Sequence, residues 1–286
     1  MGVTDVEGLP RPVPVLDHVV VNARDRLDAA RDAYGRLGFT LTPRGYHTLG
    51  SMNHLAVLGT DYIELIGVAP GAGARADVLA FPCGLNGFVF GTEDADATYA
   101  ALTRAGVAVE APLAFSRPVE LASGRQADAR FRTVHTQRGQ LPFGRLYFCE
   151  HTTRSLVWRD EWRHHANGAV GVLGAVIAAH EPDVVLDLLA RMFGQGTVQR
   201  DAAGGGLVAG LARLTVVRPK ALRMQFGEMA PEGDGRPSWM AALTLRTLSL
   251  EQAAVALQGV SEAARERERI LVPATAAMGV AIEFRE

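Results

Sequence analysis

Apolar and polar positions near the start of the chain follow two different periods. Residues 13–21 form a valine-rich run that is typical of a buried strand. The next apolar residues recur at helical spacing, at Leu27, Ala30, Ala33, Tyr34 and Leu37. Gly38 stands where a glycine commonly ends a helix. Three strand-like runs follow, at 39–41, 53–59 and 61–67. The pattern predicts a βαβββ module.

The same order of elements returns along the chain, although the copies share little sequence identity. A second copy is expected where a helix over 94–104 ends at Gly106. Two further copies are predicted after residue 168, with Pro182 in the first turn of a helix. The expected bounds are 1–160 for a first domain, with modules at about 13–68 and 86–153, and 168–286 for a second, divergent pair of modules.

Each predicted module has one small sheet with a helix on one side. Two such sheets can join into an open half-barrel whose helices lie outside. The predicted fold class is therefore α+β, with repeated βαβββ modules that form half-barrel sheets. Side chains that project into the hollow are the natural site of chemistry, because small ligands prefer concave surfaces.

Composition narrows the range of partners. The chain has 286 residues and a formal net charge of −2 at pH 7, so no overall positive field attracts nucleic acid or an acidic membrane. No apolar run reaches the ~20 residues of a membrane-spanning helix, and the N-terminal stretch lacks the order of a signal peptide. We expect a cytoplasmic protein that binds a small-molecule ligand, with no nucleic acid and no membrane as partner. A homodimer is one expected assembly.

Two strands of the first module each carry one side chain that can bind a metal. His18 lies in the first strand, where alternation places Asp17 on the opposite face. Glu64 lies within the apolar run 61–67, and burying an unpaired carboxylate costs several kcal/mol, of the order known for single ions. An imidazole beside a carboxylate suits zinc, iron(II), manganese, cobalt or nickel. A hydrogen-bonded core histidine and an arginine-paired glutamate are the alternative interpretation.

The second module can be aligned on the first with two further positions. Glu150, in the run 145–151, falls at the place of Glu64, and Gly87 falls at the place of His18. The two cysteines, Cys83 and Cys149, lie far apart and form no paired metal motif.

These residues also carry a family resemblance. "LDHVVV" (16–21) and "YIELIG" (62–67) resemble the first and last strands of the opening module of the vicinal oxygen chelate superfamily. His47, Gly50 and Asn53 are similar to the glyoxalase-like members of its glyoxalase, bleomycin resistance and dioxygenase group. The resemblance implies paired βαβββ modules around a divalent metal ion.

The resemblance also implies which residues hold the ion. The implied metal ligands are His18, Glu64 and Glu150, and Gly87 cannot ligate at the fourth position. Either water or substrate completes the site, or His151 substitutes, or the metal ion has been lost.

The resemblance implies a metal-dependent lyase or isomerase that acts on a small substrate with adjacent oxygens. Glu64 and Glu150 are then the expected catalytic carboxylates, and Asn53, Tyr62 and His47 the expected substrate-binding residues. A non-catalytic, resistance-type binding protein is the main alternative. An extradiol iron(II) dioxygenase is a weaker one, because its usual ligands are two histidines and one carboxylate. Residues 168–286 offer no matching ligands and are expected to be a structural partner.

Overall fold

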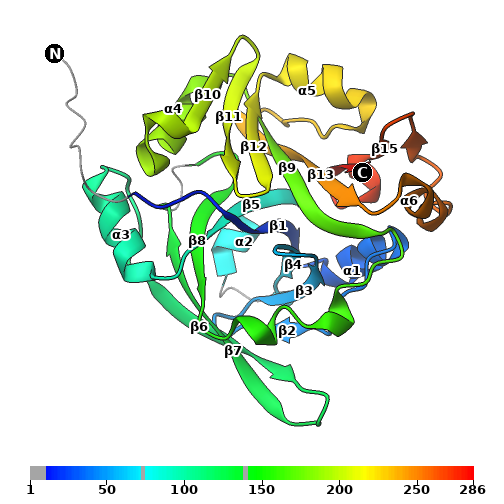
Figure 1. Cartoon of the computed structure of the whole chain (residues 1–286), viewed down its shortest axis with the longest axis horizontal. Coiled ribbons are helices and arrows are strands. Elements are labelled where there is room, and N and C mark those ends of the chain that lie inside the picture. Colours follow the sequence, from blue (N-terminus) through cyan, green and yellow to red (C-terminus); the bar gives the residue numbers. More distant parts are fainter. Residues whose placement is uncertain (1–10, 72–74, 138–140) are drawn as a thin grey trace.

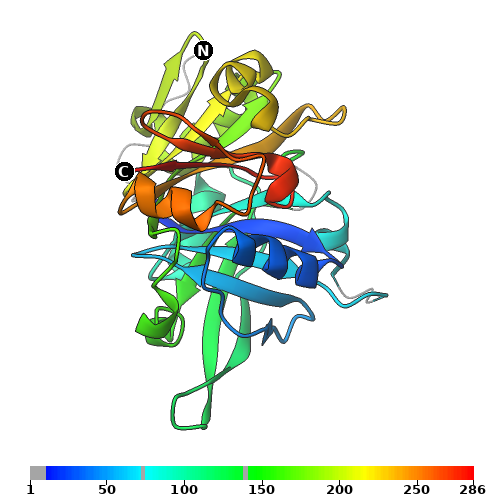
Figure 2. The ribbon, with the colours of Figure 1, turned by 90° about the vertical axis from the view of Figure 1, so that its right-hand side faces the viewer.

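The computed structural model describes residues 11–71, 75–137 and 141–286. In both views two curved sheets lie one above the other, with the first half of the chain in one and the second half in the other (Figures 1 and 2). Each sheet has eight strands. The fold is mixed α+β and is built from half-barrel modules, which confirms the predicted fold class.

The first sheet contains two βαβββ modules. Its strands are β1 (Leu16–Arg24), β2 (Gly45–Tyr46), β3 (Met52–Val57), β4 (Tyr62–Gly67), β5 (Gly84–Gly91), β6 (Leu113–Glu120), β7 (Gln126–His135) and β8 (Arg145–His151). The helices are α1 (Leu27–Arg36), α2 (Ala76–Leu79) and α3 (Ala95–Arg104). The strand order is β2-β3-β4-β1-β5-β8-β7-β6, so β1 and β5 lie at the centre.

The second sheet repeats this plan. Its strands are β9 (Ala169–Ala179), β10 (Val198–Asp201), β11 (Gly204–Ala209), β12 (Ala212–Val217), β13 (Ser238–Thr247), β14 (Ala264–Arg265), β15 (Ile270–Val272) and β16 (Ala281–Arg285). The helices are α4 (Pro182–Phe193), α5 (Pro219–Phe226) and α6 (Leu250–Ala256). The strand order, β10-β11-β12-β9-β13-β16-β15-β14, is the same arrangement with β9 and β13 at the centre.

The predicted glycines at the ends of the helices are correct, but one predicted strand is not. Gly38 and Gly106 adopt φ values of 85° and 70°, a conformation that costs glycine little. Residues 39–41, predicted as a strand, have no strand structure. Thr40 instead donates its backbone N–H to the ring Nδ1 of His165, at 3.0 Å. The chain here is tied to the segment that links the two halves, so no neighbouring strand pairs with it.

The first sheet curls until its two edge strands meet. Thr48, just after β2, donates its backbone N–H to the carbonyl of Ser116 in β6, at 3.0 Å. Ser116 donates its own N–H to Thr48 Oγ1, at 3.3 Å. The β6–β7 hairpin continues past this closure and projects from the body of the molecule (Figures 1 and 2). The closure turns the concave face of this sheet into a lined hollow.

The convex faces of the two sheets share one core. Apolar side chains of β1, β5 and β8 pack with α1, and the same cluster continues through β9, β13 and α4. Phe90 of β5 and Phe193 of α4 are in direct contact, with ring centroids 4.6 Å apart. Burial of this apolar surface stabilises the pairing of the two halves.

The hollow of the second sheet is filled by the chain itself. Leu222 and Phe226 of α5 are almost fully buried and belong to one cluster with Val176 of β9 and Trp239 of β13. Arg218, at the start of α5, donates from Nη1 to the carbonyl of Ala202, at 2.9 Å. The helix therefore occupies the space that a ligand would need.

No helix within the described ranges has the length and apolar character needed to span a membrane.

Candidate active site

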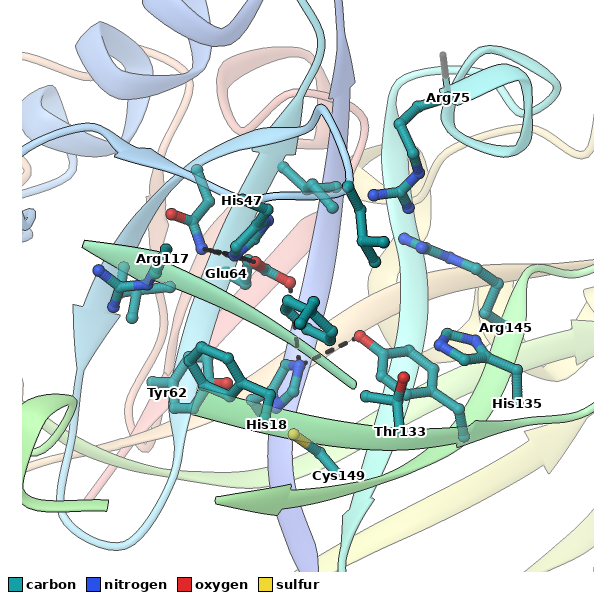
Figure 3. Close-up of a pocket in the computed structure, with 17 residues that line it drawn as sticks. His18, His47, Tyr62, Glu64, Arg75, Arg117, Thr133, His135, Arg145 and Cys149 are labelled. Atoms are coloured by element: carbon teal, nitrogen blue, oxygen red, sulfur yellow. Dashed lines mark hydrogen bonds and ion pairs between the residues drawn. The ribbon is translucent and has the colours of Figure 1, made fainter. Parts of the chain in front are cut away.

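The first sheet encloses a cavity on its concave face. The cavity and the open solvent at its mouth together hold about 560 Å³ free of protein atoms, and side chains from β1, β3, β4, β6, β7 and β8 line it. His18, His47, Tyr62, Glu64, Arg75, Arg117, Arg145 and Tyr147 are among the lining residues (Figure 3). Both modules of the first half thus contribute to one site.

The structure brings His18 and Glu64 together. β1 and β4 are neighbouring parallel strands in which His18 lies opposite Tyr62 and Val20 lies opposite Glu64. The ring Nε2 of His18 is 3.8 Å from Oε2 of Glu64, and both side chains are buried. Tyr62 stacks on His18 with ring centroids 4.3 Å apart. The two strands therefore present an imidazole and a carboxylate to the same point of the cavity.

A β-bulge brings Asp17 to the same side as His18, which corrects the alternation expected from the sequence. Leu16 pairs with Phe90 and His18 with Val89, so Asp17 is an extra residue relative to β5. Its Oδ2 accepts a hydrogen bond from His18 Nδ1, at 2.6 Å. The same oxygen accepts from His151 Nε2, at 2.9 Å. Asp17 is a candidate site residue that periodicity could not find.

The two imidazoles fix the charge of Asp17. Burial raises the pKa of the Asp17 carboxyl, but the charge of His151 and the hydrogen bonds from His151 and His18 outweigh it. The pKa therefore lies well below its ordinary range, and the carboxylate is ionised at neutral pH. An ionised Asp17 accepts the Nδ1 hydrogen of His18, so the lone pair of Nε2 faces the cavity.

Glu64 is held by an amide on its other side. Asn53 donates from Nδ2 to Oε1 of Glu64, at 2.7 Å. Burial raises the pKa of Glu64, but the charges of His47 and His18 and the bond from Asn53 together bring it below its ordinary value. Glu64 is thus a stable buried carboxylate whose Oε2 faces His18.

His47 completes this wall of the cavity. Its Nδ1 is 2.9 Å from Ser51 Oγ and its Nε2 is 3.2 Å from Asn53 Nδ2. The Asn53 amide can donate to both Glu64 and His47 Nε2, which assigns the ring hydrogen to Nδ1. Burial is the main cause that lowers the pKa of His47, to about 4, so the ring is neutral at pH 7.

The structure places Glu150 outside the cavity. Its Oε2 accepts from the backbone N–H of Ala95, at the start of α3, at 3.0 Å and lies 3.7 Å from Arg132 Nη1. α3 packs on the side of β8 that faces away from His18 and Glu64, in one cluster with Leu146 and Phe148. Glu150 is therefore not brought together with the other two expected ligands.

The strand register explains why Tyr147 takes the place given to Glu150. Gly87 pairs with Arg145 as His18 pairs with Tyr62, so the residue that matches Glu64 is Tyr147. Tyr147 and Glu150 are three positions apart, and an odd shift moves a side chain to the other face of a sheet. The Tyr147 hydroxyl lies 3.2 Å from His18 Nε2. Burial raises the pKa of Tyr147 well above its ordinary value, so the hydroxyl is neutral.

Three arginines also line the cavity. Arg75 forms two hydrogen bonds to Asp77, at 2.8 and 2.7 Å, and a third to Ser51 Oγ. Arg145 donates from Nε to Asn86 Oδ1, at 3.1 Å, and its Nη1 lies 3.9 Å from Asp77. Figure 3 shows this pair on one side of Glu64 and Arg117 on the other. The three guanidinium groups have no distinguishing motif in the sequence.

The comparisons with known proteins identify the family and the fold. The family model described as "Glyoxalase-like domain" matches residues 16–193, which is more than half of the chain. The chain belongs to this glyoxalase-like family. The family is part of the vicinal oxygen chelate superfamily, so the resemblance noted in the sequence is confirmed. No curated protein sequence matches this glyoxalase-like chain.

Solved structures share the fold across both halves. A hypothetical protein from Staphylococcus aureus matches with a TM-score of 0.66 and 12% identity, over 96% of this chain and 99% of that one. A mutant of 4-hydroxymandelate synthase from Streptomyces coelicolor matches with a TM-score of 0.54 and 12% identity, over 96% and 93%. A xylose isomerase-like TIM barrel/4-hydroxyphenylpyruvate dioxygenase fusion protein matches with a TM-score of 0.58 and 12% identity, over 97% and 50%. At this identity the likeness shows the fold alone.

The glyoxalase-like chain has a second group that could hold a metal ion. The ligand atoms of Asp17, Cys149 and His151 all lie within 4.8 Å of one another. Burial raises the pKa of the Cys149 thiol well above its ordinary value. Asp17 Oδ2 already accepts from two ring nitrogens. In this structure the group supports His18, because Asp17 holds the His18 ring through Nδ1.

Proposed function

We propose that the cavity of the first sheet binds a divalent metal ion through His18 and Glu64. The site would then act as a lyase or isomerase on a small substrate with adjacent oxygens. The observation that carries the proposal is the 3.8 Å approach of His18 Nε2 to Glu64 Oε2. Glu150 has no part in it, because its carboxylate binds the start of α3.

The residues present fit such an ion. An imidazole nitrogen and a carboxylate oxygen are donors that zinc, iron, manganese and nickel accept. Asp17 orients the His18 ring from behind, as carboxylates commonly do for metal-bound histidines. Such an ion, when bound, supplies Lewis-acid stabilisation of charge on a substrate oxygen. Two protein donors leave other coordination positions for water or substrate.

The remaining cavity residues have separate roles in this proposal. His47 is neutral at pH 7 and its Nε2 lies 3.9 Å from Glu64 Oε1, so it forms an uncharged polar wall beside that carboxylate. The amide of Asn53 fixes the positions of the Glu64 and His47 side chains through its two hydrogen bonds. The Tyr147 hydroxyl is a neutral donor that can bind a substrate oxygen beside His18.

One observation favours a non-catalytic binding protein as the second candidate. Only two of the four ligand positions of the fold carry metal-competent side chains, because Gly87 and Tyr147 occupy the others. A Cβ at Gly87 would lie 2.9 Å from the side chain of Val20, so the packing of β1 on β5 favours glycine there.

The iron(II) dioxygenase is the weakest candidate. His18 faces Oε2 of Glu64 whereas His47 faces Oε1. The two imidazoles therefore approach different oxygens and do not form a compact group of two histidines and one carboxylate.

The expected domain division, 1–160 and 168–286, stays a proposal, as do the homodimer and the cytoplasmic location.

Metal analysis tests the proposed function. We expect protein purified without chelator to bind a divalent ion, and His18→Ala and Glu64→Gln to lower that affinity by more than about 100-fold, since each removes a ligand rather than a supporting group. Glu150→Gln is the matched control and should keep the ion, because Glu150 lies on the other face of β8. Metal titration by calorimetry measures all four proteins. Equal loss in Glu150→Gln, or no bound ion in the wild type, would reject the metal site and leave the binding-protein candidate.

A further inference from the structure

We propose that the cavity recognises the carboxylate group of a small, largely apolar organic acid, and that Arg117 binds this carboxylate. The inference rests on the proposed function in one respect: the acid occupies the same cavity as the His18 and Glu64 pair.

Arg117 is a buried cation that the charge of Glu64 partly compensates, although the two form no ion pair in the described part of the chain. Its side chain lies in the wall of the cavity and the residue is 5% exposed. Among the residues that the structure describes, no group forms a hydrogen bond or ion pair with its guanidinium, and its Nε is fully buried without a partner. Burial of an unpaired charge costs several kcal/mol. A buried guanidinium without a hydrogen-bond partner indicates that an anionic group of a bound ligand pairs with it.

The fold makes room for Arg117 at the seam of the barrel. β6 carries Arg117 and meets the segment of β2 through the hydrogen bonds between Thr48 and Ser116. A Cβ at Gly45 of β2 would lie 2.9 Å from Arg117 Cδ and 2.4 Å from Asn53 Oδ1. A larger residue at position 45 would press on the Arg117 stem and on the Asn53 amide. The position of the guanidinium is therefore set by packing.

The charges of the cavity favour an anion as a whole. Arg75 and Arg145 share Asp77, and Glu64 is the carboxylate that faces the interior. Arg145 Nη2 is buried and has no hydrogen-bond partner among the described residues. Three guanidinium groups thus outnumber the two carboxylates near them, and a hollow with apolar walls concentrates the resulting positive field.

The apolar part of the lining indicates the rest of the ligand. Phe115 and Phe131 stack with ring centroids 5.1 Å apart, and His47 packs edge-on against Phe115 at 5.3 Å. Leu49 and Leu55 line the same cavity. Aromatic surfaces of this kind pack best on a flat apolar group. The ligand class is therefore an organic acid with one ring-sized apolar body.

A matched pair of probes tests the proposal. Phenylacetate and phenylacetamide have nearly the same shape, but only phenylacetate carries a charge at neutral pH. We expect the wild-type chain to bind phenylacetate at least about tenfold more tightly, which corresponds to roughly 1.4 kcal/mol. Arg117→Gln should abolish this preference, and Arg117→Lys should keep part of it because lysine retains the charge without the planar fork.

The variants need a readout of their own folding. Arg130→Gln, on the exposed surface of β7, is the control and should bind phenylacetate like the wild type. Removal of an unpaired buried charge should raise the Tm of Arg117→Gln without ligand by about 2–4 °C. A lower Tm, or failure to fold, would show that Arg117 is structural and would overturn the proposal. Equal binding of acid and amide by the wild type, or no binding of either, would also overturn it.

Titrations with and without chelator separate this inference from the proposed function. Acid preference that depends on Arg117 in a protein that binds no metal ion would retain the anion site and reject the metal site. A metal ion bound by His18 and Glu64 without any preference for the acid would retain the metal site and reject the anion site.

Discussion

Asp17→Asn is expected to lower the free energy of unfolding at pH 7 by about 3–5 kcal/mol, the cost of breaking a buried charged network. The carboxylate of Asp17 accepts hydrogen bonds from both His18 and His151 inside the protein. An asparagine has no charge, so both imidazoles lose a charge-assisted hydrogen bond to the oxygen that they share. Urea unfolding of the variant and the wild type at pH 7 measures the difference.

The loss of stability caused by Asp17→Asn is expected to become smaller as pH falls. Asp17 has a lower pKa in the folded than in the unfolded chain, so below about pH 4 the unfolded state binds more protons. Its stabilising effect is present above the unfolded pKa and is lost as pH falls. The gap between Asp17→Asn and wild type should therefore narrow from pH 5 to pH 3. Asp160→Asn, at an exposed site, should show no gap at any pH. A gap that stays constant with pH would mean that the charge of Asp17 contributes nothing.

Asp61→Asn is expected to act in the opposite direction and to stabilise the protein at pH 8. Asp61 is buried where the two halves meet, and its Oδ1 accepts from the backbone N–H of Val172 in β9, at 3.1 Å. Burial raises the pKa of this carboxyl from an ordinary value of 3.8 to about 7. Above that pH the folded protein carries a buried charge that asparagine avoids.

The sign again follows from proton binding. Between pH 3.8 and about pH 7 the folded chain holds a proton that the unfolded chain has released, so stability falls as pH rises. Each pKa unit corresponds to 1.36 kcal/mol, which gives Asp61→Asn an advantage of up to about 4 kcal/mol at pH 8 and almost none at pH 4. Urea unfolding at pH 4, 6 and 8 measures it. An advantage of equal size at all three pH values would contradict the assigned cause.

The approach of His18 to Glu64 could be predicted because both lie within one module. Two neighbouring parallel strands with a two-residue period place side chains of matching parity on the same face. The helix over Leu27–Arg36 and its terminal Gly38 were predictable for a similar reason, since the apolar spacing and the glycine are local signals.

Glu150 could not be placed in this way. Its position depends on how β8 pairs with β5, and the run 145–151 is compatible with several registers. A shift from Tyr147 to Glu150 changes the face, because the shift is odd. The sequence alone contains no residue that fixes this register.

Asp17 and Arg117 were missed for different physical reasons. The bulge at Asp17 arises from the pairing with β5, so strict alternation along β1 puts its side chain on the wrong face. Arg117 reaches the cavity only because β6 returns to meet β2 and close the barrel. Contacts that depend on such long-range closure are not encoded in local spacing.

The two halves are expected to differ in how ligand binding changes their local stability, because α5 already fills the hollow of the second sheet. Phe226 and its neighbours on α5 fill the concave face of the second sheet, so that half is fully packed without any bound compound. A ligand stabilises the conformation that it binds, so a compound in the first cavity should stabilise the first half and leave the local stability of the second half unchanged. Amide hydrogen exchange upon ligand addition should slow in β1, β4 and β6–β8, while the amides of β12 and β14–β16 exchange at unchanged rates.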